Sequence, residues 1–148
     1  MDDAELLGCV RWVSHGFELV QSIFPGWRFS AADTVAAYGL HGALLVGPRV
    51  EVADPARWVD ALRSFEIELR CDGEAVDRGS ASHVLDGPLS AIRHLVEVLA
   101  AQPEQPPLAA GEIVTTGTLT RAFPASPGQT WSTALGGVDL PGARVKFV

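Results

Sequence analysis

Apolar residues recur every three or four positions in two stretches of the chain, and this spacing predicts two amphipathic helices. The first covers residues 4–14, and the second covers residues 88–101 with the longest continuous apolar stripe. Two shorter helices are expected at residues 30–38 and 56–62, because each begins at or just after a residue typical of a helix N-cap. The pattern therefore predicts helices that are all short.

Other stretches have the patterns of strands. Residues 65–70 alternate between apolar and charged side chains, which predicts a strand with one buried and one solvated face. The Asp72-Gly73 pair that follows is the strongest hairpin signal, and the chain is expected to return through residues 75–76. The apolar run 43–46 is expected to be a buried strand. Further strands are expected at residues 16–22, 50–52, 112–118, 129–134 and 143–148. These elements predict an α+β protein with a strand-rich second half.

The composition favours one domain, residues 1–148, because 47% of the side chains are hydrophobic and only 20% are charged. The net charge of −7 disfavours nucleic acids and anionic membranes as partners. The acidic start differs from a secretory signal, and the longest uncharged run, residues 34–48, is too short to cross a bilayer. We therefore expect a cytoplasmic protein. Its two cysteines form neither a disulfide framework nor a zinc-site spacing.

Two residues stand out as candidates for acid–base chemistry. Glu18 lies among Phe17, Leu19 and Val20 in an expected strand. A carboxylate in such surroundings usually has a partner or an altered affinity for protons, although a solvated surface glutamate is the alternative. His41 lies in an uncharged run, where a neutral imidazole can shuttle protons or can bond to a carbonyl in the core. Both interpretations stay open for each residue.

Glu66 and Glu68 lie two positions apart on an expected strand, so their side chains share a face. Paired carboxylates of this kind can bind a metal ion. Arg70 continues the same face, which favours the simpler interpretation of a solvated strand surface.

Several segments carry a family resemblance. They are Gly16–Ser22, Ala32–Ala36 leading to Gly42–Gly47, Val84–Leu89 and Leu108–Leu119. The last is the most specific, because a Gly-acid-Ile-Val-x-Thr-Gly pattern is followed by a Pro-Gly turn and a closing strand. Together these segments resemble the fumarylacetoacetate hydrolase superfamily, and most closely its branch of 2-keto-4-pentenoate hydratases and 4-oxalocrotonate decarboxylases.

The resemblance implies a mixed β-roll with short helices packed on it, corresponding to the C-terminal part of such an enzyme. It also implies a site where Mg²⁺ or Mn²⁺, held by three acidic residues, stabilises an enolate-like intermediate of a 2-oxo acid. Glu18 matches the last of these three ligands. The other two ligands and a lysine belong to an upstream part of the family pattern that this sequence does not contain. Departures also occur at Gln21, Ile23, Tyr38 and His41.

These observations lead to a main functional hypothesis and two alternatives. The main one is a shortened enzyme that carries out cyclisation, isomerisation or dehydration of an enolisable carbonyl substrate, with no cofactor expected. The first alternative is a hydratase or decarboxylase of small 2-oxo acids that uses Mg²⁺ or Mn²⁺, with Glu18 as a ligand and a partner subunit completing the site. The second is a non-catalytic partner of a full-length relative.

The candidate site residues follow from these hypotheses. The expected catalytic residues are Glu18, His41 and Asp33. The residues expected to bind the small carbonyl substrate are Phe17, Gln21, Trp27, Tyr38, Thr116 and Trp131. A family member without the upstream part exposes surfaces that this part would cover, so we expect a homo-oligomer.

Overall fold

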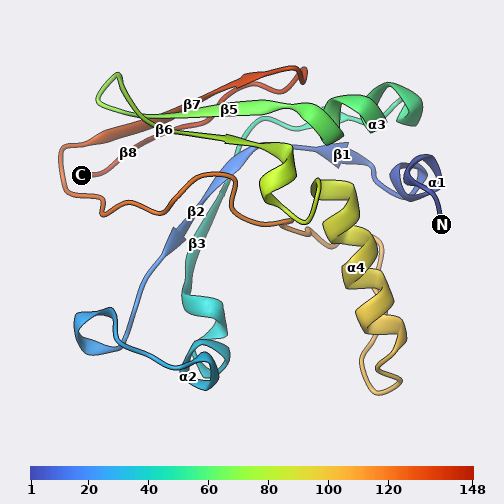
Figure 1. Ribbon diagram of the computed structural model, residues 1–148, viewed down its shortest axis with the longest axis horizontal. Helices are drawn as coiled ribbons and strands as arrows, with labels where there is room; N and C mark the ends of the chain where they lie inside the picture. Colours follow the sequence, from blue (N-terminus) through green and yellow to red (C-terminus); the bar gives the residue numbers. More distant parts are fainter.

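A computed structural model describes residues 1–148 of the chain (Figure 1). The α-helices are α1 (Asp3–Gly8), α2 (Ala31–Ala36), α3 (Pro55–Ser64) and α4 (Pro88–Ala100), and the 3₁₀ turns are η1 (Pro25–Trp27), η2 (Tyr38–Leu40) and η3 (Ala81–His83). The strands are β1 (Trp12–Val13), β2 (Gly16–Val20), β3 (His41–Val46), β4 (Val50–Glu51), β5 (Glu66–Cys71), β6 (Glu74–Ser80), β7 (Thr130–Gly136) and β8 (Arg144–Lys146). The expected α+β class is confirmed. None of the helices combines the length and the apolar character needed to cross a bilayer.

The largest sheet is antiparallel and has the strand order β6-β5-β7-β8. Asp72 and Gly73 join β5 to β6 and both have positive φ, as a tight hairpin turn requires. The predicted hairpin is therefore confirmed. Ile67 and Leu69 of β5 are buried, as their alternation with charged residues predicted.

The buried core lies at one end of this sheet, where α1, α3 and α4 meet. Its buried members are Leu6, Leu7, Trp58, Leu62 and Leu89. Burying one such side chain stabilises the fold by about 1.5–3 kcal/mol. Only 14 of the 148 residues are buried, so this core is small for the length of the chain.

Charged groups connect the same three helices. Asp3 at the start of α1 accepts a hydrogen bond from Arg63 of α3 at 2.8 Å and also pairs with Arg93 of α4. Asp3 itself is largely shielded from solvent, whereas the two arginines are partly exposed. The first turn of the chain is therefore held against both longer helices.

Strands β2 and β3 form a separate two-stranded sheet, which leads to α2 at its far end. We call residues 16–46 the arm, because Figure 1 shows this part projecting away from the four-stranded sheet and the helices. Residues 43–46 form a strand as predicted, but the prediction that this strand is buried is wrong. They are extended, but every residue of β3 is exposed because no second layer of the chain covers the arm.

Two predicted elements differ from the structure. The helix expected over residues 4–14 ends at Gly8, because Cys9 caps it and the aromatic and β-branched pair Trp12 and Val13 joins β4 instead. The strand expected over residues 112–118 is irregular. Gly117, at φ +130°, interrupts its extended backbone, and no strand pairs with it.

Candidate functional site

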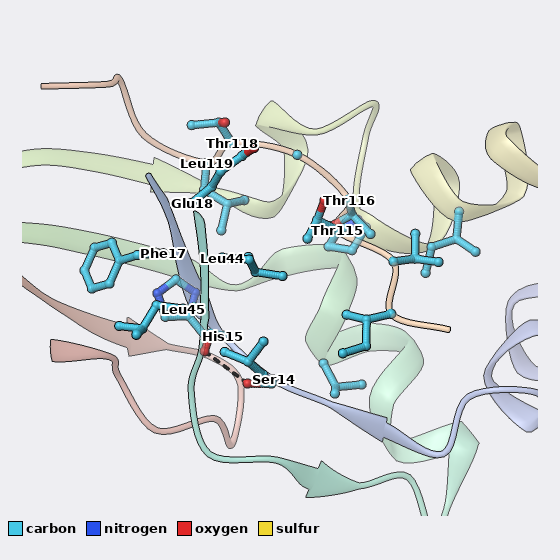
Figure 2. Close-up of a pocket in the computed structure, with 18 of the residues that line it drawn as sticks. Ser14, His15, Phe17, Glu18, Leu44, Leu45, Thr115, Thr116, Thr118 and Leu119 are labelled. Atoms are coloured by element: carbon cyan, nitrogen blue, oxygen red, sulfur yellow. Dashed lines mark hydrogen bonds between the residues drawn. The ribbon is translucent and has the colours of Figure 1, made fainter. Parts of the chain in front are cut away.

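An open hollow of about 2010 Å³ lies between the arm, the four-stranded sheet, α4 and residues 107–125. We call it the trough. Most of its lining side chains are hydrophobic, and residues 107–125 line it along their whole length. Figure 2 shows Glu18 of the arm, Thr116 and Thr118 of this segment, and His15 around the same hollow.

Glu18 and His41 form a hydrogen-bonded pair on the arm. The distance between Glu18 Oε1 and His41 Nδ1 is 2.9 Å. Glu18 lines the trough whereas His41 does not, and both side chains keep partial contact with solvent. With Nδ1 protonated, the imidazole donates to the carboxylate, which leaves Nε2 free to exchange protons. The structure therefore gives Glu18 the polar partner that its apolar surroundings suggested.

A β-bulge brings this pair together. Leu19 is opposite Ala43, but the next residue, Val20, is opposite His41, so Gly42 is the extra residue on β3. Successive side chains of a strand point to opposite faces, and the extra residue therefore moves His41 onto the face that carries Glu18. Glycine is needed here because a Cβ on Gly42 would lie 2.8 Å from the Leu19 carbonyl oxygen.

His15 also lines the trough, and sequence reasoning did not select it. Burial lowers the pKa of its imidazole from the ordinary value of 6.5, so the ring is neutral near pH 7. Its Nε2 is buried without a hydrogen-bond partner, and the ring stands edge-on to Phe17 with the centroids 6.2 Å apart. The alternation of Val13, His15 and Phe17 was the signal that could have placed this ring on the apolar face.

Residues 115–123 are held against the edge of the sheet by three interactions. His83 Nδ1 lies 3.0 Å from the Leu119 carbonyl oxygen, and Arg121 pairs with Asp77 of β6 at 3.2 Å. Hydrogen bonds from Arg121 hold the pKa of Asp77 below its usual value. A Cβ on Gly79 would lie 2.0 Å from the Leu119 carbonyl, so only glycine allows this approach. Residues 119–121 are therefore held close to the sheet edge.

The structure brings some of the predicted site residues together and separates others. Phe17, Thr116 and Trp131 line the trough with Glu18, and the buried Trp131 packs on Phe123 with ring centroids 5.9 Å apart. Trp27 borders the trough from the arm but is 56% exposed.

Three predicted site residues lie elsewhere on the arm. Gln21 and Tyr38 are exposed and do not line the trough. The Asp33 carboxylate caps α2 by accepting hydrogen bonds from the Ser30 backbone N–H at 2.8 Å and from the Ser30 hydroxyl at 2.9 Å. These bonds hold the pKa of Asp33 below its usual value. Its carboxylate thus has a structural partner away from the trough.

The side chains of this chain do not by themselves fit a divalent metal site. No group of three or more His, Cys, Asp or Glu residues lies close enough to hold an ion. Glu68 is engaged by Arg70 and Arg78, which hold the pKa of its carboxyl group below its usual value. A hard cation needs several oxygen ligands, and Glu18 supplies a single carboxylate at the trough.

Comparison with known proteins is consistent with this fold. The chain is 28% identical over 134 residues to 2-hydroxyhexa-2,4-dienoate hydratase of Comamonas testosteroni, covering 90% of this chain and 48% of the relative. It is 27% identical over 140 residues to 4-oxalocrotonate decarboxylase of Pseudomonas putida, covering 95% and 51%. The chain thus spans about half the length of the curated relatives it matches.

Solved structures agree with the sequence matches. The structure of 4-oxalocrotonate decarboxylase from Pseudomonas putida G7 complexed with magnesium and adipate superposes with a TM-score of 0.79 and 27% identity, over 96% of this chain and 52% of that one. A second structure of the enzyme, complexed with calcium and acetate, gives a TM-score of 0.76. Both structures of this enzyme are complexed with a divalent metal ion, so they do not support the expectation that no cofactor is used.

The family itself is shown by a match over most of the chain. The sequence profile described as "Fumarylacetoacetate (FAA) hydrolase C-terminal" matches residues 4–140. This span includes the arm, the four-stranded sheet up to the end of β7, and residues 107–125. Together with the shared fold, it confirms the expected mixed architecture. The chain therefore belongs to the fumarylacetoacetate hydrolase family and corresponds to the C-terminal part of its hydratase and decarboxylase relatives.

Proposed function

We propose that this chain carries part of the active site of a lyase that hydrates or decarboxylates a small 2-oxo acid. The observation that carries the proposal is the superposition of nearly the whole chain on a decarboxylase complexed with magnesium and the dicarboxylate adipate. The family match over residues 4–140 includes Glu18 and most of the residues that line the trough. Because the chain spans about half of each relative, the complete activity requires further residues.

A second polypeptide, together with the substrate, is the proposed source of these groups. A single carboxylate at the trough falls short of the ligand set that a divalent ion requires. The carboxylate and keto oxygens of a 2-oxo acid can add two ligands, and acidic side chains of a partner can supply the others. In this arrangement the chain contributes Glu18 and the apolar walls formed by Phe17 and Trp131.

The chain's own residues can act on protons at the substrate. The Glu18 carboxylate can accept a proton from the carbon next to the keto group, while its hydrogen bond with His41 orients both side chains. Protonated Glu18 can pass this proton to Nδ1 of the tautomer that carries its hydrogen on Nε2, and the Nε2 proton then leaves to solvent, because His41 stays partly exposed.

The same pair supports a second candidate function. The 2.9 Å contact between Glu18 and His41 is a complete acid–base pair without a metal ion. It suits metal-independent cyclisation, isomerisation or dehydration of an enolisable carbonyl compound. The two candidates differ in their requirement for a divalent ion, and this difference can be measured directly.

Turnover of 2-hydroxyhexa-2,4-dienoate and of 4-oxalocrotonate can be followed by the loss of ultraviolet absorbance, with Mg²⁺ or with a chelator. For the lyase we expect turnover, once the second polypeptide is present, that depends on Mg²⁺ and falls about 10²-fold or more in Glu18→Gln. The matched control is Glu66→Gln, which removes an exposed strand carboxylate without an ion pair and should leave turnover unchanged. Turnover that survives chelation would favour the metal-independent candidate instead.

Substitution of His41 tests whether the chain is catalytic or only shares the fold of the family. If the pair moves a proton, His41→Ala lowers kcat about 10²-fold or more. Turnover that is unchanged in both Glu18→Gln and His41→Ala contradicts both candidate functions. If Glu18→Gln and His41→Ala leave the turnover measured with the second polypeptide unchanged, the chain is a non-catalytic partner of a longer relative.

A further inference from the structure

The outer face of the four-stranded sheet carries a cluster of positive charge. Side chains alternate between the two faces of a strand, and the inner face of this sheet lines the trough. Figure 1 shows the arm, α4 and residues 107–125 on one side of the sheet, away from its outer face. We call the four basic residues of the outer face the basic face, and they are Arg70, Arg78, Arg144 and Lys146.

The strand register brings these side chains together. Arg78 of β6 is opposite Glu68 of β5, and paired residues of neighbouring strands share a face. Arg70 and Arg144 lie in one row across β5, β7 and β8, so their backbones are about 10 Å apart. Lys146 lies two positions after Arg144 on β8 and therefore points to the same side.

One carboxylate fixes two of these cations in place. Glu68 is only 18% exposed and pairs with Arg70 at 2.6 Å and with Arg78 at 2.7 Å. Hydrogen bonds from the two arginines hold the pKa of Glu68 below its usual value, so it stays ionised. Side chains that are already ordered lose less conformational entropy on binding. The exposed guanidinium groups of Arg70 and Arg78 are therefore pre-organised for a partner.

The other two cations have no partner within the chain. Arg144 and Lys146 are exposed, and neither forms an ion pair with a carboxylate. Glu66, at the far end of β5, is the other acidic residue on this side of the sheet besides Glu68. Four positive charges thus face two negative ones here, although the chain as a whole has a net charge of −7.

The shape and size of the basic face favour a folded protein as its partner. The trough includes none of its four residues, and a flat sheet surface lacks the concave walls of small-molecule sites. Four strands of up to six or seven residues cover roughly 400 Å². This is about half of the ~800 Å² per partner in a stable complex, so the contact belongs to the weak, transient class.

The charge of the rest of the chain disfavours a long polyanion. A nucleic acid extends beyond the basic face and meets the negative charge that the remaining surface carries. A compact partner is affected mainly by the charges within about 8 Å of the contact at physiological salt.

We propose that the basic face docks an acidic surface of a different folded protein in a transient, salt-sensitive complex. Carboxylates of the partner pair with Arg144 and Lys146, which the chain leaves unmatched, and with the exposed guanidinium groups that Glu68 orders. Complementary charge accelerates the encounter and orients the two proteins. The proposal rests on the charge of this sheet face and does not depend on the proposed function.

Fluorescence anisotropy tests the site with a helical peptide that has glutamates along one face and an uncharged dye. In the comparison peptide, glutamine replaces every glutamate. We expect only the acidic peptide to bind, with an affinity that falls as NaCl is raised from about 20 to about 200 mM. Arg144→Glu and Lys146→Glu should each weaken binding about tenfold, because a repulsion replaces an attraction.

The matched control is Arg28→Glu. It changes the charge of the chain by the same amount at an exposed position on the arm, and it should leave binding unchanged. Circular dichroism verifies that each variant is folded. If Arg28→Glu weakens binding as much as Arg144→Glu, the total charge and not this sheet face determines binding.

Other outcomes also overturn the proposal. Absence of binding at low salt, or equal binding of both peptides, means that the basic face does not dock carboxylates. Tighter binding of a single-stranded DNA of equal charge identifies a nucleic-acid surface. Release of the peptide by inorganic phosphate, but not by NaCl of equal ionic strength, identifies a small-anion site. Sedimentation velocity that shows self-association abolished by Arg144→Glu makes a second copy the partner.

Discussion

The buried imidazole of His15 makes stability depend on pH in a defined range. Its pKa is lowered below 6.5 in the folded chain, so the unfolded chain binds the proton more readily. Stability is therefore fully present above pH 6.5 and decreases as the pH falls below this value. We expect His15→Gln to reduce the loss of stability between neutral and mildly acidic pH, as measured by urea denaturation at each pH.

The exposed His94 provides the control for this prediction, since His94→Gln should leave the pH dependence as it is. The carboxyl groups affect stability in a different pH range. The pKa values of Asp33, Glu68 and Asp77 are lowered, so their contributions are lost only at pH values below their ordinary range of 3.8–4.5. Equal acid sensitivity of His15→Gln and the unmodified chain would contradict the role of His15.

At the scale of single residues, the sequence predicted which side chains need polar partners better than it predicted which side chains lie in the site. Glu18 and His41 were selected because polar groups in apolar runs need partners, and each is the partner of the other. Asp33 and Tyr38 were assigned to the site from sequence, but the structure places them at the far end of the arm. His15 was missed, although it directly precedes the strand that was expected from Gly16 and that begins there in the structure.

At the scale of elements, the bulge at Gly42 determines the geometry of the Glu18–His41 pair. In Gly42→Ala the new methyl group would meet the Leu19 carbonyl oxygen at 2.8 Å, so the strands must move apart or lose the bulge. We expect a loss of stability of about 1–3 kcal/mol and a fall in kcat similar to that of His41→Ala. Chemical denaturation and turnover assays measure the two effects.

Gly136→Ala is the control for Gly42→Ala, because a Cβ on Gly136 of β7 meets no atom within 4 Å. It should change neither property. Gly42→Ala with normal turnover would mean that the bulge does not position His41.

Local signals predicted the elements that depend on local interactions. The Asp72-Gly73 turn and the apolar stripe of α4 gave a hairpin and a helix close to their observed limits. The exposure of β3 could not be predicted, because an apolar run indicates burial without indicating which surface covers it. Residues 112–118 contain β-branched side chains, but pairing depends on a neighbouring strand that local sequence does not specify.

At the scale of the whole molecule, length and composition predicted a single domain with a sizeable core. The single domain stays a prediction, and the core is smaller than expected because only 14 of the 148 residues are buried. The apolar residues are present in the expected number, but many line the trough or the arm instead of an enclosed interior. Composition counts apolar side chains and carries no information on whether one chain can enclose them all.

The position of β7 beside β5 also has a consequence for the order in which the sheet assembles. The β5–β6 hairpin closes through a tight turn and can form within microseconds. Strand β7 joins only after α4 and residues 107–125 have been brought back across the molecule, which requires a much longer loop to close. During synthesis the free edge of β5 therefore stays open until the last strands emerge, and we expect this interval to be when the chain is most prone to aggregate.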